Sequence, residues 1–171
     1  DNYLRKTDVF KFINAIDNDK ILESPAQAAS EIDQLQLDLE VSSGIDNRVL
    51  VDKIITLAEK MLDNDKFYHL LLDLSKMMTD NGELNFAFEI AQDLINKIES
   101  SSNYTEIHAE TESIISKIYW CQAQWEESEY HCEEAYKLFK LISKQSGYAR
   151  CENMYGTLYG EKGDFIKAQE H

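Results

Sequence analysis

The sequence contains very little proline and glycine, with one Pro and six Gly among 171 residues. Folds built from many short strands need these residue types in their turns, so their scarcity argues against such a fold. The two-residue alternation of a half-buried strand is also missing from every segment. Residue types that favour helices, such as leucine, alanine, glutamate and lysine, are plentiful. We therefore expect an all-α fold with a sizeable core.

Positive charge is scarce as well. Lys and Arg number 17 against 32 Asp and Glu, which gives a formal net charge of −15. Such a surface repels nucleic-acid phosphates and anionic lipids, so we expect neither nucleic acid nor a membrane as a partner. No apolar run approaches the roughly 20 residues that a membrane-spanning helix needs. The charge suits a basic or neutral protein partner, or it serves solubility alone.

The sequence also lacks the motifs of common catalytic and cofactor sites. Its three cysteines, Cys121, Cys132 and Cys151, form no paired-thiol motif, and their odd number favours a reducing, cytoplasmic compartment. His131 precedes Cys132, but neighbouring residues on a helix point about 100° apart, so we expect no shared metal ion. A phosphate-binding loop, a nucleophile elbow and a His-Glu-x-x-His motif are all absent. We expect no enzyme activity, no cofactor and no metal.

Helix-type periodicity and break signals divide the chain into an N-terminal helix and linker, residues 1–23, and a helical domain, residues 24–171. Ser24-Pro25 is a strong helix start, Val49 and Ile54 are expected to face inward, and Ser146-Gly147 reads as a break. The sequence starts without a methionine and stops inside an unfinished helix, so we expect a fragment of a longer protein. About 8–9 helices are predicted, in pairs at about 24–63, 66–100, 104–144 and 147–171, the last one truncated.

Three of these pairs share a repeated pattern of about 40 residues. Leu84, Trp125 and Phe165 begin the second helices, at spacings of 41 and 40 residues. A small residue follows three positions later, and the first helices carry small residues at a matching position. These two sets of small residues are Ala87, Ser128 and Ala168, and Ser75, Ser116 and Gly156.

This pattern resembles the tetratricopeptide (TPR) repeat, in which small residues lie where two helix backbones touch. The period exceeds the usual 34 residues and is similar to the long repeats of kinesin light chains, of polarity adaptors with leucine-glycine-asparagine repeats, and of bacterial regulators. The resemblance implies an antiparallel helix-pair α-solenoid. The pair at 24–63 matches the small-residue positions poorly and is interpreted as a divergent repeat.

The resemblance also implies a concave groove lined by the first helices. Asn153 stands where a long-repeat TPR protein bonds a peptide backbone, since an amide both donates and accepts hydrogen bonds. Met154 occupies the place of a second asparagine, and the clamp for a terminal carboxylate is absent, so chaperone tails are not the implied ligand. The predicted groove residues are His69, Lys76, Ser113, Lys117, Trp120, Arg150, Asn153 and Thr157.

Two interpretations of these groove residues stay open. The basic residues Lys76, Lys117 and Arg150 either bind acidic side chains of a ligand or pair with neighbours such as Asp73 and Glu110. Trp120 either anchors a ligand or packs against the following helix. The sequence does not decide between them.

The function expected from this pattern is a non-catalytic scaffold that binds a peptide or helix of a partner protein. The alternative is a regulatory or sensor TPR segment of a larger bacterial signalling protein or transcription regulator. A homodimer through the truncated C-terminal end, near Tyr155 and Phe165, is also predicted.

Overall fold

The computed structural model describes residue 30 and residues 46–98 and 102–170, and these ranges contain helices and no strand. The all-α prediction is therefore confirmed for the described residues. The predicted linker at 1–23 and the helix start at Ser24-Pro25 lie outside them. Among the helices described, none is both long and apolar enough to cross a membrane. In chain order, the elements are α3 (Asp46–Met61), α4 (Asn64–Asp80), α5 (Leu84–Ile98), a 3-10 helix (Ser102–Tyr104), α6 (Thr105–Cys121), α7 (Trp125–Leu141), α8 (Gln145–Glu161) and α9 (Phe165–Glu170).

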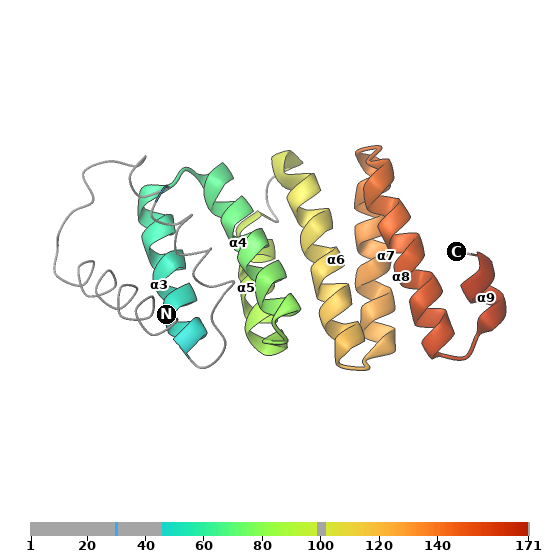
Figure 1. Ribbon diagram of the computed structural model, residues 1–171. Helices are drawn as coiled ribbons and strands as arrows, with labels where there is room; N and C mark the ends of the chain where they lie inside the picture. The colour runs from blue at the N-terminus through green and yellow to red at the C-terminus, as the bar shows by residue number, and fades with distance from the viewer. Residues whose placement is uncertain (1–29, 31–45, 99–101, 171) are drawn as a thin grey trace. The chain divides into compact units, whose positions relative to one another are not determined.

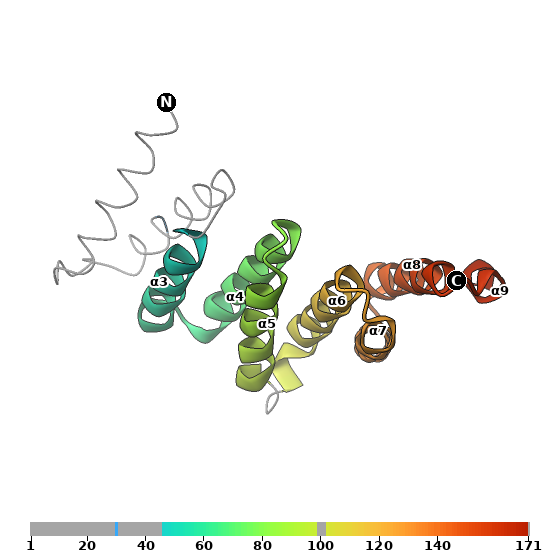
Figure 2. The same ribbon diagram turned by 90° about the horizontal axis from the view of Figure 1, so that it is seen from below.

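The chain divides into two compact units, residues 1–67 and 68–171, with the boundary in the first turn of α4. Within the second unit, α6 packs against α5, α7 and α8, and α9 packs against α8. In the views of Figures 1 and 2, α4, α6 and α8 lie on one side of this unit and α5 and α7 lie on the other. The first helices of the last three predicted pairs, α4, α6 and α8, therefore lie on the same side.

Helix α3 corrects one prediction about burial. Val49 was expected to face inward, but it is 55% exposed, while Leu50, Val51, Ile54 and Ala58 are buried. The buried residues follow the three-four spacing of one helix face. Val49 lies two positions from Val51, which turns it about 200° away from that residue. The true apolar face is therefore set by Val51, Ile54 and Ala58.

The turns after α4, α6 and α8 share one hydrogen-bond pattern, the Schellman motif, in which an amide reaches back to the carbonyl five residues earlier. The residue in the left-handed conformation is Gly82, Ala123 or Gly163, with φ angles of 82°, 57° and 76°. A non-glycine residue in this conformation costs about 1 kcal/mol, and Ala123 adopts it all the same. The three bonds run from Glu83 N to Met78 O (2.9 Å), Gln124 N to Tyr119 O (2.9 Å) and Asp164 N to Tyr159 O (2.8 Å).

The small residues predicted to meet within each pair do meet. Ser75 Oγ donates to the carbonyl of Ala87 at 2.9 Å, and Ser116 Oγ donates to that of Ser128 at 2.8 Å. In the last pair, a Cβ placed on Gly156 would lie 3.6 Å from the carbonyl oxygen of Ala168. Equivalent positions in the three pairs therefore make equivalent contacts, with the hydroxyl missing from the third.

Restoring that hydroxyl should stabilise the last pair. We expect Gly156→Ser to raise the free energy of unfolding by about 1 kcal/mol, since serine both supplies the hydrogen bond and favours helix over glycine. Gly156→Ala is the matched control, because it changes the backbone preference without adding a donor. Urea denaturation followed by circular dichroism measures both. A serine variant less stable than the alanine variant would mean that this position does not repeat the contacts of Ser75 and Ser116.

Helix α8 begins earlier than predicted. Ser146-Gly147 was interpreted as a break, but α8 starts at Gln145, and Gly147 is a buried residue in its first turn. A Cβ on Gly147 would approach the ring of Phe139 to 2.3 Å. This glycine is thus a site of close helix packing, not a chain break. The prediction was wrong because both roles require the same residue type.

Candidate functional site

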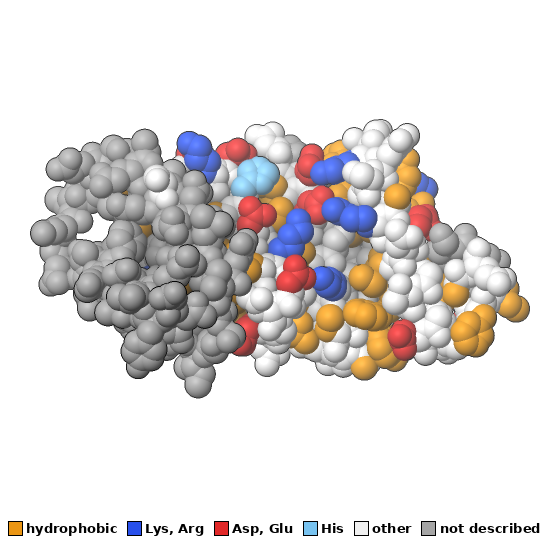
Figure 3. Space-filling view, in the orientation of Figure 1, with side chains coloured by type: hydrophobic (Ala, Val, Ile, Leu, Met, Phe, Trp, Pro, Cys, Tyr) orange, Lys and Arg blue, Asp and Glu red, His pale blue; other side chains and the backbone are white. Residues whose placement is uncertain are grey.

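The predicted groove residues lie on α4, α6 and α8, and the side of the second unit formed by these helices is called here the α4/α6/α8 face. Figure 3 shows acidic and basic side chains alternating across it. His69 and Lys76 on α4 are exposed, as are Arg150, Asn153 and Thr157 on α8. On α6, Lys117 is exposed, whereas Ser113 and Trp120 are partly buried.

Ion pairs connect successive helices across this face. Lys117 Nζ lies 2.6 Å from Asp80 Oδ1, and an Arg150 guanidinium nitrogen lies 2.7 Å from Glu110 Oε1. Of the two interpretations of the basic residues, pairing with neighbouring helices is the one observed for Lys117 and Arg150. Glu110 is a partner as predicted, while Lys117 pairs with Asp80 and not with Asp73. The pair of Lys117 with Asp80, in which both side chains are exposed, contributes roughly 0–1 kcal/mol.

Glu110 lies at the centre of this charge network. Its side chain is 12% exposed and receives Arg150 and Lys144, the latter at 3.4 Å. Burial raises the pKa of Glu110, but the hydrogen bond from Arg150 and the charges of Arg150, Lys76 and Lys144 outweigh it, so the pKa is lowered. Lys144 also bonds to Glu106, and this bond raises the pKa of the lysine. An ionised carboxylate therefore joins α6 to α8 beneath the face.

The remaining groove residues differ in what they offer a ligand. Trp120 is partly buried, and its Nε1 has no acceptor among the described residues. The Trp120 ring is therefore partly covered, and its role as a ligand anchor stays a prediction. Thr157 Oγ1 donates to the backbone carbonyl of Asn153 at 3.0 Å, and the Asn153 side chain is exposed. His69 is likewise exposed.

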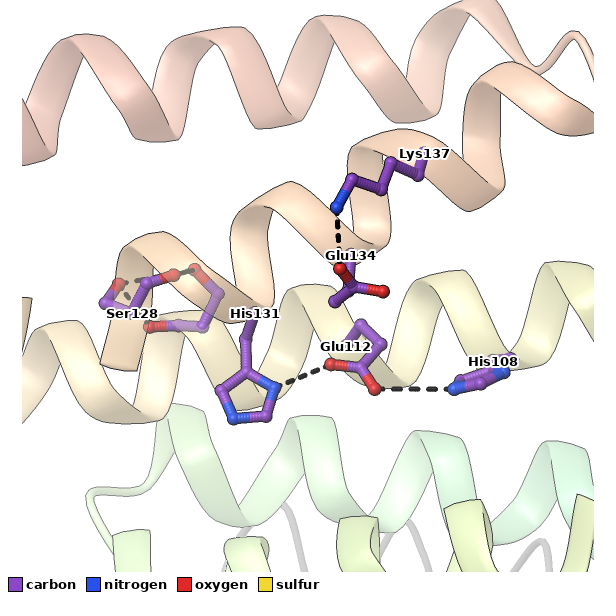
Figure 4. Close-up of polar contacts among 7 residues, drawn as sticks. His108, Glu112, Ser128, His131, Glu134 and Lys137 are labelled. Carbon is purple, nitrogen blue, oxygen red and sulfur yellow. Dashed lines mark hydrogen bonds and ion pairs between the residues drawn. The ribbon is translucent and has the colours of Figure 1, made fainter. Parts of the chain in front are cut away.

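A second polar cluster joins α6 to α7. Glu112 is only 7% exposed, and its two carboxylate oxygens contact His131 Nδ1 at 2.6 Å and His108 Nε2 at 3.3 Å. Figure 4 shows Glu112 between the two rings. Tyr119 stacks on His131, with ring centroids 5.3 Å apart. Burial raises the pKa of Glu112, but the bonds from His108 and His131 more than offset it, so the net pKa is lowered and the group is ionised.

The histidine cluster was not predicted, because the sequence drew attention to His131 with Cys132. The two histidines contact different oxygens of Glu112, so their nitrogens do not converge on one point. Within the part of the chain that the structure describes, no three such side chains could hold a metal ion. A comparison of equivalent repeat positions could have indicated the cluster. Forty-one residues earlier, the positions of His108, Glu112 and His131 hold the buried apolar residues Phe67, Leu71 and Ile90.

The C-terminal helix exposes the apolar surface that the sequence placed there. Phe165 and Ile166 on α9 are 69% and 76% exposed, and Tyr155 on α8 is partly buried. Beside them, Tyr159 donates to Glu129 Oε1 at 2.7 Å, and this bond raises the pKa of Tyr159 to about 12. The predicted homodimer through this end stays a prediction.

Comparison with known proteins supports the fold and nothing finer. No protein-family model matches this sequence, and no curated protein matches it. The crystal structure of BtubC (BKLC) from P. vanneervenii is similar, with a TM-score of 0.68. The match covers 98% of this chain and 68% of that chain, at 17% sequence identity. At this identity the similarity concerns the fold alone.

Proposed function

We propose that this protein is a non-catalytic interaction scaffold, a TPR-like α-solenoid that binds a peptide or helical segment of a partner protein on the α4/α6/α8 face. The equivalent contacts of Ser75, Ser116 and Gly156 support a repeated helix pair. Stacked pairs of this kind present a long surface without requiring catalytic groups. The observation that carries the proposal is the repetition of exposed polar side chains on three successive first helices.

The chemistry of this face suits an extended or helical protein segment. The exposed amide of Asn153 can both donate to and accept from a peptide backbone. Arg150 has five N–H donors, and its bond to Glu110 leaves others for an incoming acceptor. The exposed pair between Lys117 and Asp80 contributes little to folding, so a partner can exchange with it at small cost. Binding then depends on residues from several helices at once.

Charge reversal on the two sides of the second unit tests this proposal. Proteins captured from an extract by the full chain are purified, and their affinities are measured for Lys117→Glu and Lys137→Glu variants. Lys117 lies on α6 and Lys137 on α7, and both are exposed and ion-paired, so the two sites are comparable. Each substitution changes the net charge of the protein by the same amount. We expect binding at least about tenfold weaker for Lys117→Glu alone. If both variants lose affinity equally, or if only Lys137→Glu loses affinity, the α4/α6/α8 face is not the binding surface.

A further inference from the structure

Two buried thiols meet between α7 and α8. Cys132 and Cys151 are each 2% exposed and share an apolar cluster with Ala109, Ala135 and Phe139. Cys132 Sγ on α7 donates a hydrogen bond to the backbone carbonyl of Cys151 on α8 at 3.5 Å. The two cysteines are 19 positions apart in sequence. Packing of the two helices thus places both cysteines in one buried cluster, with the Cys132 thiol against the backbone of Cys151.

The two thiols have unequal surroundings. The hydrogen bond from Cys132 lowers the pKa of Cys151, burial opposes this, and the charge of Arg150 lowers it further. The interaction with Cys151 and then burial raise the pKa of Cys132. The positive charge of Arg150, the residue adjacent in sequence, therefore favours the thiolate of Cys151. Because the thiolate is the reactive form of cysteine, Cys151 is the better nucleophile.

The pair is particular to this place in the repeat. One repeat earlier, the positions of Cys132 and Cys151 hold Ala91 and Thr111, both buried. Packing therefore does not require sulfur at either position. The third thiol, Cys121, is exposed and lies outside the cluster.

We propose that Cys132 and Cys151 are a redox modification site, a dithiol that hydrogen peroxide oxidises to a disulfide between α7 and α8. The thiolate of Cys151 attacks one peroxide oxygen, the O–O bond breaks, and hydroxide leaves, which gives a sulfenic acid. Cys132 then loses its proton to that hydroxide and attacks the Cys151 sulfur. The S–O bond breaks and hydroxide leaves with a proton from solvent. Two thiols and one peroxide become one disulfide and two waters.

The disulfide would fasten α8 to α7. Helix α8 carries Arg150 and Asn153, and Arg150 is adjacent to Cys151 in sequence. A covalent link also restricts the unfolded chain, so the oxidised protein resists unfolding more than the reduced protein. Reversible oxidation of this kind is the usual form of disulfide in a reducing compartment. The site is thus a switch for the rigidity of the α7–α8 contact.

The experiment uses the full chain with Cys121→Ser, which leaves the two buried thiols alone. The folded protein is treated with hydrogen peroxide and then denatured in the presence of a maleimide, which labels every thiol that is still reduced. The product is analysed by intact mass and peptide mapping. We expect the loss of two hydrogen atoms, no maleimide addition, and one peptide pair joined through Cys132 and Cys151. The thermal midpoint should rise by about 5 °C or more and return when a reductant is added.

Single-thiol variants complete the test. In the same background, Cys132→Ala should leave Cys151 as a sulfenic acid that a dimedone probe traps, with no internal link. Cys151→Ala should leave Cys132 largely reduced. The proposal is overturned if both thiols of the folded parent remain open to maleimide after peroxide treatment. A link that forms only after unfolding in urea would overturn it too.

Discussion

Replacing Gly147 with alanine is expected to lower the free energy of unfolding by about 2 kcal/mol. The added Cβ would lie 2.3, 2.4 and 2.6 Å from three ring carbons of Phe139, a side chain with no exposed surface. Alanine favours helix over glycine by about 1 kcal/mol, which reduces the loss without reversing it. The displaced ring also supports Arg150, whose guanidinium carbon lies 5.5 Å from its centroid. Urea denaturation measures the change.

Gly160 supplies a control on the same helix. A Cβ there meets nothing within 4 Å, so Gly160→Ala should be neutral or stabilise the protein by up to about 1 kcal/mol. In a Phe139→Leu background, Gly147→Ala should lower the free energy of unfolding by less than it does in the parent, because the ring that the Cβ would contact is absent. If Gly147→Ala and Gly160→Ala have the same effect, the close contact of α8 with Phe139 is wrong.

The cluster of Glu112, His108 and His131 gives the second large effect. Glu112→Leu alone should cost about 2–3 kcal/mol, because two partly buried histidines lose a charged acceptor. Replacing all three with the residues found one repeat earlier, by His108→Phe, Glu112→Leu and His131→Ile, should restore or exceed the parent stability. Apolar replacement of a complete buried ionic group is often neutral or stabilising. A triple variant less stable than Glu112→Leu would contradict this account.

The same cluster predicts a pH dependence. The lowered pKa of Glu112 means that its contribution to stability is present above the ordinary pKa of glutamate. That contribution is lost as the pH falls through the lower folded value, at pH below about 4. The stability difference between the parent and Glu112→Gln should therefore shrink as the pH falls below about 4. A difference that does not change down to pH 3 would show that Glu112 is not ionised. Glu110 and Glu129 titrate in both proteins, so the comparison reports on Glu112 together with its two histidine partners.

Sequence periodicity predicted the helices of the second unit well. The starts of α5, α7 and α9 at Leu84, Trp125 and Phe165 were predicted correctly, since they depend on a repeated local pattern. The role of Gly147 was not, because a glycine before an apolar run marks either a break or a close contact. The choice between them depends on Phe139, which lies on another helix.

Pairing on the candidate face was only partly predictable. Arg150 with Glu110 follows from helices that lie side by side one repeat apart, and it was among the pairs expected. Lys117 pairs with Asp80, which the sequence did not single out, because its partner on α4 depends on how the helices are shifted along their axes. The bond of Glu112 to His131 joins residues 19 positions apart on different helices. Only the comparison of repeat positions could have indicated it.

Lysine footprinting of the bound complex tests the central claim, that the α4/α6/α8 face binds a partner protein. Lys76 and Lys117 lie on this face, and Lys137 and Lys140 are exposed on α7. Acylation rates of the four lysines are compared with and without a captured partner. We predict that the partner slows acylation of Lys76 and Lys117 and leaves Lys137 and Lys140 unchanged. Slowing confined to Lys137 and Lys140 would contradict the account and place the binding surface on the other side.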